Sequence, residues 1–139
     1  MNIIISPLPL ILATIFQTVL GMAWFGKLFG KQWMTYMEFA KRSDAEKKES
    51  ETHMPKLYIG QLVVTVIANI LLATCIKALP GVNPYTVAIA LWVGFVLTSQ
   101  ATATIWSQTK FAHVPAQIAI ATSYQLVSMI VSTFLIVNL

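Results

Sequence analysis

The stretch PLPLILATIFQTVLGMAWFGKLFGKQWM, residues 7–34, determines the fold that the sequence predicts. Its first twenty residues carry no charge, and about 20 helical residues cross a hydrocarbon core of about 30 Å. The first charged side chain is Lys27. Four aromatic residues surround it: Trp24, Phe25, Phe29 and Trp33. Because aromatic and lysine side chains are typical of the membrane–water interface, the stretch predicts a membrane-spanning helix over residues 7–26.

Composition extends this prediction to the whole chain. Of its 139 residues, 57% are hydrophobic and 10% are charged, whereas soluble domains have about 25% charged residues. Three further apolar runs are long enough to span a bilayer: 57–76, 85–106 and 115–137. They lack the period-two alternation of a spanning β-strand. We therefore expect an all-α membrane protein, with residues 1–139 forming a single integral membrane domain and a four-helix bundle of transmembrane helices.

Charge is concentrated in the loop between the first two spans, residues 27–56. This loop holds seven of the nine Lys and Arg residues and all five acidic residues. The turn after the third span adds Lys110, whereas the opposite side has only Lys77. The positive-inside rule then predicts a multi-pass protein of the cell (inner) membrane, with loop 27–56 cytoplasmic and both termini outside. The loop's small net charge and the absence of an aromatic–basic RNA motif argue against nucleic acid as a partner.

Part of this loop has the pattern of an amphipathic helix lying on the membrane surface. Over residues 31–42 the polar and apolar side chains separate onto opposite faces. The expected interfacial anchors on the apolar face are Trp33, Tyr36 and Met37. Downstream, the sequence SDAE at 43–46 has the form of a capping box and predicts a short second helix that ends near Ser50. We expect residues 47–56 to form a solvated connection.

Polar side chains inside the predicted spans are a further signal, because a polar group in a bilayer needs a partner or a water-filled cavity. Two interpretations stay open: the side chains pair directly between helices, or they surround a cavity for a small neutral or weakly charged solute. The residues expected to line that cavity are Gln17, Trp24, Gln61, Asn69, Gln117, Tyr124 and Gln125. No Asp, Glu, Lys or Arg lies in mid-span, which argues against proton-coupled or voltage-driven transport and leaves passive conduction.

The third span is polar around its whole circumference, which predicts a central position or a contact between protomers. Small residues form one ridge along it at Gly94, Thr98 and Thr102. They form a second ridge on another face at Ser99, Ala103 and Ser107. Small residues allow close approach of membrane helices, so we expect the second ridge to mediate a homo-oligomer, a dimer or trimer. Another membrane protein is the alternative partner.

Residues suited to catalysis or metal binding are scarce. The chain has two histidines, His53 and His113, and the single cysteine Cys75. The spans contain no carboxylate for acid–base chemistry, and the chain has no nucleophile motif and no phosphate-binding glycine loop. We expect no enzyme, no cofactor and no metal. The sequence favours a structural or accessory membrane protein that acts by helix association and self-assembly, and the alternative is a small-solute channel or transporter.

Three blocks of sequence carry a resemblance to a known family. The first is Gly21-x-x-Trp24-Phe25 followed by Leu28-Phe29-Gly30-x-x-Trp33-Met34. The others are WVGFVLTSQATATIW at 92–106 and ATSYQLVSM at 121–129. In these blocks the chain resembles the small bacterial membrane proteins grouped as domain of unknown function 1761 (DUF1761). It departs from them at Gly26-Lys27, where members often carry Ser-Pro. The resemblance implies four membrane helices and no established activity.

Overall fold

A computed structural model describes residues 4–37, 41–107 and 110–139, and every regular element in these ranges is helical. The elements, with η1 and η3 π-helical and η4 3₁₀, are α1 (Pro7–Met22), η1 (Ala23–Leu28), α2 (Gly30–Tyr36), α3 (Asp44–Ala78), α4 (Pro84–Leu91), η3 (Trp92–Leu97), α5 (Thr98–Ile105), η4 (Phe111–His113) and α6 (Val114–Asn138). Within the described ranges, four helical segments are long and apolar enough to cross a membrane: Pro7–Leu28, Asp44–Ala78, Pro84–Ile105 and Phe111–Asn138. The expected all-α architecture is confirmed, with four helical segments of the length and composition that a membrane span needs.

Local sequence explains where several helices begin. Asn83 precedes α4, and its side chain accepts a hydrogen bond from the Tyr85 amide at 2.9 Å. Pro84 follows at the first helical position. A backbone N–H there has no acceptor within the helix, so the N–H that proline lacks is not needed. At the start of α3, the Ser43 hydroxyl accepts from the Glu46 amide at 3.2 Å, and the Glu46 carboxylate accepts from the Ser43 amide at 3.3 Å. The predicted capping box is therefore confirmed.

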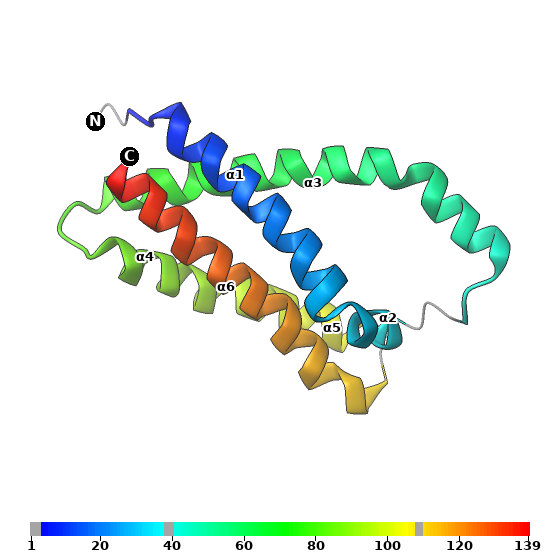
Figure 1. Ribbon diagram of the computed structural model, residues 1–139. Helices are drawn as coiled ribbons and strands as arrows, with labels where there is room; N and C mark the ends of the chain where they lie inside the picture. Colours follow the sequence, from blue (N-terminus) through cyan, green and yellow to red (C-terminus); the bar gives the residue numbers. More distant parts are fainter. Residues whose placement is uncertain (1–3, 38–40, 108–109) are drawn as a thin grey trace.

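The helix that this box begins is much longer than the sequence suggested. α3 runs without interruption for 35 residues, so the expected short helix ending near Ser50 and the solvated connection at 47–56 are wrong. Pro55 lies inside α3 and removes one backbone hydrogen bond. Residues 51–64 are all exposed, so the carbonyl that loses its partner stays accessible. The first turns of α3 bend away from the line of the rest (Figure 1), as expected near a helical proline.

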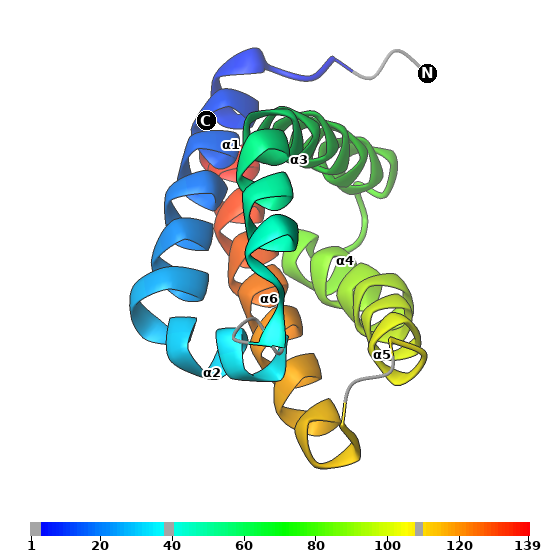
Figure 2. The ribbon, with the colours of Figure 1, turned by 90° about the vertical axis from the view of Figure 1, so that its right-hand side faces the viewer.

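Helix α6 occupies the centre of the bundle. It packs against α1 on one side and against α4 and α5 on the other, and the two perpendicular views agree on this arrangement (Figures 1 and 2). The chain ends N and C lie at the same end of the bundle, away from α2 (Figure 1). At that end the Lys77 ammonium donates to the Ile4 carbonyl. α3 packs against α1, α4 and α6, and its buried residues all lie between Thr65 and Ile76.

The distribution of polar and apolar side chains is inverted relative to a soluble protein. The largest fully buried side chains are Asn69, Thr133, Ser128 and Ser132. Large apolar side chains such as Ile15, Val19 and Ile59 are more than half exposed. A small apolar cluster of Leu72, Ile76, Val87 and Ala88 joins α3 to α4. A protein that exposes apolar side chains and buries small polar ones is suited to an apolar solvent, which supports a membrane location.

Two tryptophans attach the neighbouring helices to α6. The indole N–H of Trp24 donates to the Ile120 carbonyl at 3.0 Å, and that of Trp92 donates to the Thr122 carbonyl at 2.8 Å. Each tryptophan lies in one of the π-helical segments, η1 or η3. π-Helical turns are rare and occur frequently at functional sites. Here both turns place a large aromatic donor against the same stretch of the central helix.

Candidate functional site

A layer of hydrogen-bonded polar side chains crosses the bundle between α1, α3 and α6. The Gln17 amide nitrogen donates to Asn69 Oδ1 at 3.0 Å and to Ser132 Oγ at 2.6 Å. The Asn69 amide in turn donates to Thr14 Oγ1 at 3.4 Å. Gln17, Asn69 and Ser132 are all buried. We define the polar layer as Gln17, Asn69 and Ser132, whose hydrogen bonds join α1, α3 and α6.

Tyr124 links this layer to the next turn of the bundle. Its hydroxyl donates to the Gln17 carbonyl at 2.8 Å, and its ring contacts the ring of Phe25 at a centroid distance of 5.3 Å. The ring fits because residue 21 is glycine: a Cβ atom there would lie 3.2 Å from the Tyr124 hydroxyl oxygen. Gly21 therefore gives the Tyr124 hydroxyl room that a larger residue would crowd, and it favours the close approach of α1 and α6 at this level.

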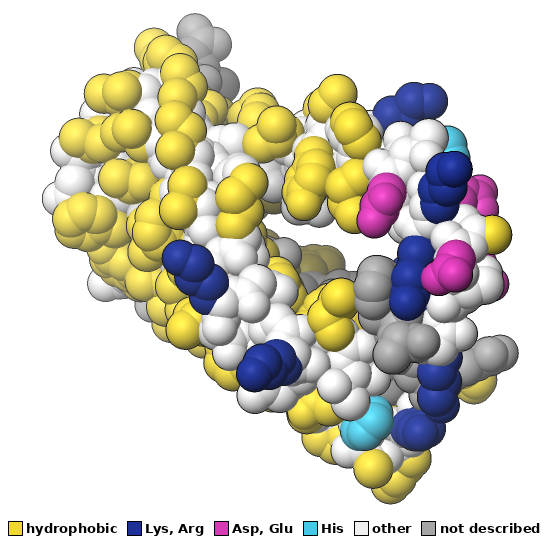
Figure 3. Space-filling view, turned by 45° about the vertical axis from the view of Figure 1, so that its right-hand side comes forward, with side chains coloured by type: hydrophobic (Ala, Val, Ile, Leu, Met, Phe, Trp, Pro, Cys, Tyr) yellow, Lys and Arg dark blue, Asp and Glu magenta, His cyan; other side chains and the backbone are white. Residues whose placement is uncertain are grey.

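A cavity of about 790 Å³ adjoins the polar layer, within the range of about 300–1,000 Å³ common for ligand pockets. α3 forms one wall, and α1, η1, α2, α5 and α6 contribute the rest. Figure 3 shows the molecule hollowed between the charged start of α3 and the rest of the bundle. The polar side chains that line the cavity are Gln17, Thr18, Tyr58, Gln61, Thr65, Gln100, Tyr124 and Gln125. Among the described residues, no Asp, Glu, Lys or Arg lines it, so it suits an uncharged molecule that forms hydrogen bonds.

The structure brings most of the predicted cavity residues together. Four of the seven line the cavity: Gln17, Gln61, Tyr124 and Gln125. Asn69 is next to it in the polar layer, and Trp24 lies behind Tyr124, with a ring centroid distance of 6.5 Å. Gln117 is elsewhere, because its amide donates to the sulfur of Met37 at 3.4 Å. The two interpretations of the polar residues therefore apply at different levels, since some pair directly and others face a cavity.

Sequence reasoning missed part of the lining. Gln100 of α5 lines the cavity, although the sequence did not distinguish it from the other polar residues of the third span. The third span is polar on every side, so no stripe distinguishes the residue that points inward. Thr18 and Tyr58 were also missed. Tyr58 lies just inside the predicted span and resembles an ordinary interfacial aromatic residue in the sequence.

The three expected interfacial anchors contact protein in the structure. Trp33 packs edge-on against Phe25 at 4.8 Å between ring centroids and also lines the cavity. Tyr36 lies against the ring of His113 at 4.9 Å, and Met37 accepts the hydrogen bond from Gln117 described above. α2 ends at Tyr36, so the expected helix over 31–42 is shorter than predicted, and its residues 38–40 lie outside the described ranges. Contact of these side chains with lipid headgroups stays a prediction.

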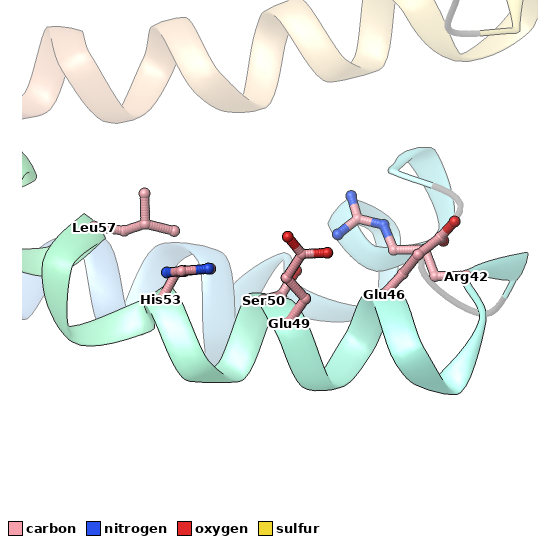
Figure 4. A pocket seen from close by; sticks show the side chains of 6 residues that line it. All are labelled: Arg42, Glu46, Glu49, Ser50, His53 and Leu57. Carbon is pink, nitrogen blue, oxygen red and sulfur yellow. The ribbon is translucent and has the colours of Figure 1, made fainter.

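A second, smaller hollow of about 410 Å³ lies beside the first turns of α3. Its side chains rise from one side of the chain (Figure 4): Arg42, Glu46, Glu49, Ser50, His53 and Leu57. Leu57 is the neighbour in sequence of Tyr58, which lines the larger cavity. The two hollows thus follow α3 in succession, the first charged and the second uncharged.

Both ridges of the third span are on the surface. Ser99, Ala103 and Ser107 are exposed, and so are Gly94, Thr98 and Thr102. The exposed hydroxyl groups bond to carbonyls of their own helix: Ser107 donates to the Thr104 carbonyl at 2.7 Å and Thr102 to the Thr98 carbonyl at 2.9 Å. The side of α5 that is buried carries Thr104. The third span is therefore peripheral, so the expectation of a central position inside one protomer is wrong.

Within the described ranges, no three His, Cys, Asp or Glu side chains are grouped so that they could hold a metal ion. The cavity therefore offers hydrogen bonds from amides and hydroxyls, together with aromatic and aliphatic surface. Groups of this kind are suited to binding and orienting a molecule through hydrogen bonds.

Comparison with known proteins supports the resemblance found in the sequence. A family model described as protein of unknown function (DUF1761) matches residues 8–137, which is nearly the whole chain. No curated protein and no solved structure is significantly similar to the chain.

Proposed function

We propose a function for this chain, which belongs to the DUF1761 family of proteins of unknown function: it binds and transports a small, uncharged, hydrogen-bonding molecule through its intramembrane cavity. The observation that carries the proposal is the cavity lined by the amides of Gln61, Gln100 and Gln125. The proposed role is non-catalytic. Amides that face an apolar solvent have few partners there, and a bound polar molecule would supply hydrogen bonds to them.

The polar layer is the gate of the proposed pathway. It closes one end of the cavity, because Gln17 bridges α1 to Asn69 on α3 and to Ser132 on α6. Passage through the bundle requires these hydrogen bonds to open. The absence of charged side chains from the lining of the described cavity favours passive movement of an uncharged solute over coupling to protons or to the membrane potential.

Glycerol flux tests the proposed function. Vesicles containing the protein are expected to swell faster in a glycerol gradient than protein-free vesicles, as followed by stopped-flow light scattering. Thr18→Phe should return the rate to that of protein-free vesicles, because Thr18 lines the cavity and the ring would occupy it.

The matched control for this variant is Val19→Phe. Val19 is the next residue, is 60% exposed and is not part of the cavity lining, so its variant should conduct like the wild type. Equal rates for wild-type vesicles, Thr18→Phe vesicles and protein-free vesicles would refute transport of this probe through the cavity. Equal loss in both variants would show that the cavity is not the path.

The proposed orientation places α2 and the start of α3 in the cytoplasm of the cell, with both termini outside the inner membrane. Its support is the charge bias of loop 27–56. In a Cys75→Ser background, single cysteines at Ala45 and Gly81 are expected to react with a membrane-impermeant maleimide from opposite sides. Both positions are exposed. Labelling of both cysteines from the outside of intact cells would contradict the orientation.

Self-association through α5 is the second candidate function. The observation that favours it is that Ser99, Ala103 and Ser107 form an exposed ridge that no other helix of the described chain covers. Because the hydroxyl groups bond within their own helix, the proposed contact depends on close packing of small residues and not on hydrogen bonds across it. We propose a dimer or trimer.

A further inference from the structure

The wall that α3 contributes to the cavity is open toward the bilayer. Tyr58 is 57% exposed and Leu62 is 42% exposed although both line the cavity, and Met22 on the facing helix α1 is 63% exposed. All three lie in the helical segments Pro7–Leu28 and Asp44–Ala78, each of which contains an apolar stretch long enough to cross a membrane. In a membrane, exposed side chains at this depth meet acyl chains, so the cavity is accessible from the side as well as from its end.

The residues of α3 that line the cavity and those that line the charged hollow lie at different positions along the helix axis. A helix rises about 1.5 Å per residue, so α3 is about 52 Å long, whereas a hydrocarbon core is about 30 Å thick. The charged turns before Leu57 therefore project beyond the core. Gln61 lies eight residues after His53, which is about 12 Å along the helix. A ligand group that contacts Gln61 therefore lies about 12 Å along the helix from His53 of the charged hollow.

The lining has two chemical parts. Gln61, Gln100 and Gln125 provide uncharged donors and acceptors, whereas Met22, Phe25 and Leu62 provide apolar surface beside the lateral opening. A purely polar solute would make no favourable contact with the apolar part, and a hydrocarbon would offer the amides no hydrogen bond. A molecule with a polar head and an apolar chain makes favourable contacts with both the amides and the apolar side chains of the lining.

We propose that the ligand of this cavity is a single-chain amphiphile with an uncharged hydrogen-bonding head, of the monoacylglycerol class, that enters from the bilayer between α1 and α3. This inference rests on the proposed function, because it names the class of molecule that the same cavity takes. The head contacts the glutamine amides, and the acyl chain extends past Met22 and Leu62 into the lipid.

Photolabelling of the full chain in nanodiscs tests this proposal. The probe is a monooleoylglycerol analogue with a diazirine on its acyl chain and a terminal alkyne for detection. Labelling is expected on peptides of α1 and α3 and should decrease on addition of unlabelled monooleoylglycerol. Leu62→Trp should reduce labelling about tenfold, because overpacking of a site costs roughly 1–3 kcal/mol and 1.4 kcal/mol corresponds to tenfold.

Val63→Trp is the matched control. Val63 is 53% exposed and is not part of the cavity lining, so its variant should be labelled like the wild type. Equal labelling of the two variants would overturn the proposal, because the probe would then be reporting general contact with lipid. Equal labelling by a lysophosphatidic acid analogue with the same acyl chain would overturn the preference for an uncharged head.

The glycerol measurement separates this inference from the proposed function. If glycerol flux is blocked by Thr18→Phe but the probe gives no labelling that depends on Leu62, the amphiphile proposal is wrong and transport stands. If labelling depends on Leu62 and no glycerol flux occurs, the amphiphile site stands and transport of glycerol-sized solutes is wrong. Failure of both measurements removes both proposals.

Discussion

Replacement of Gln17 by leucine is expected to lower the free energy of unfolding by about 1–3 kcal/mol, the cost of leaving buried partners unsatisfied. Gln17 donates to Asn69 and Ser132 at 3.0 and 2.6 Å, and Leu supplies neither bond. Hydrogen bonds between membrane helices average about 0.6 kcal/mol, with a maximum near 1.7 kcal/mol, so two bonds together fall in the same range. Equilibrium unfolding in mixed micelles, followed by circular dichroism, measures the change.

Gln61→Leu is the matched control for this prediction. Gln61 is exposed, and its amide donates within its own helix to Thr65 at 3.3 Å, so the same substitution should change stability little. A double-mutant cycle between Gln17→Leu and Asn69→Leu should give a coupling energy of about 0.6–1.7 kcal/mol. Equal effects of the Gln17 and Gln61 variants, or a coupling near zero, would mean that the layer does not hold the helices together.

The second large effect is expected on the oligomeric state of the protein. Ala103→Leu should convert a dimer or trimer into a monomer, because a leucine on the ridge of Ser99, Ala103 and Ser107 prevents the close approach that small residues allow. The molecular mass of the protein, measured by light scattering in mild detergent and by mass photometry in nanodiscs, should fall to that of one chain. The loss corresponds to association weakened by at least about tenfold, or 1.4 kcal/mol.

The control for this variant is Ala68→Leu, the same substitution at an exposed position of α3, which should leave the mass of the assembly unchanged. The circular dichroism of both variants should match the wild type, because Ala103 is exposed as well. A wild-type protein that is monomeric in both detergent and nanodiscs would refute self-association.

Features that depend on short-range sequence were predictable. Uncharged runs of about 20 residues identified the four spans, since the energetic demand of the bilayer acts on each segment separately. The capping box at Ser43 and Glu46 was also readable, because both of its hydrogen bonds join residues three apart. The length of α3 was not predictable in this way. Residues 47–56 are mostly polar and include Pro55, and the local sequence does not show that the helix continues through them.

The cavity depends on how each helix is rotated, and rotation follows from packing between distant segments. The sequence shows that Gln17 and Gln61 are polar residues inside predicted spans. It does not show that Gln17 meets Asn69 and Ser132 while Gln61 is left facing open space. The π-helical segments that hold Trp24 and Trp92 add to this difficulty, because a π-helical turn shifts the rotation of every residue beyond it and no residue type marks it reliably.

The central position of α6 has a consequence for the order of events during synthesis. Three donors of the earlier helices find acceptors on this last helix: Gln17 on Ser132, Trp24 on Ile120 and Trp92 on Thr122. A ribosome releases these acceptors only after the first three spans have been made. Until then, the nascent chain carries donors that lipid does not satisfy. The bundle therefore closes only after α6 has been synthesised, and until then the first three spans lack these acceptors.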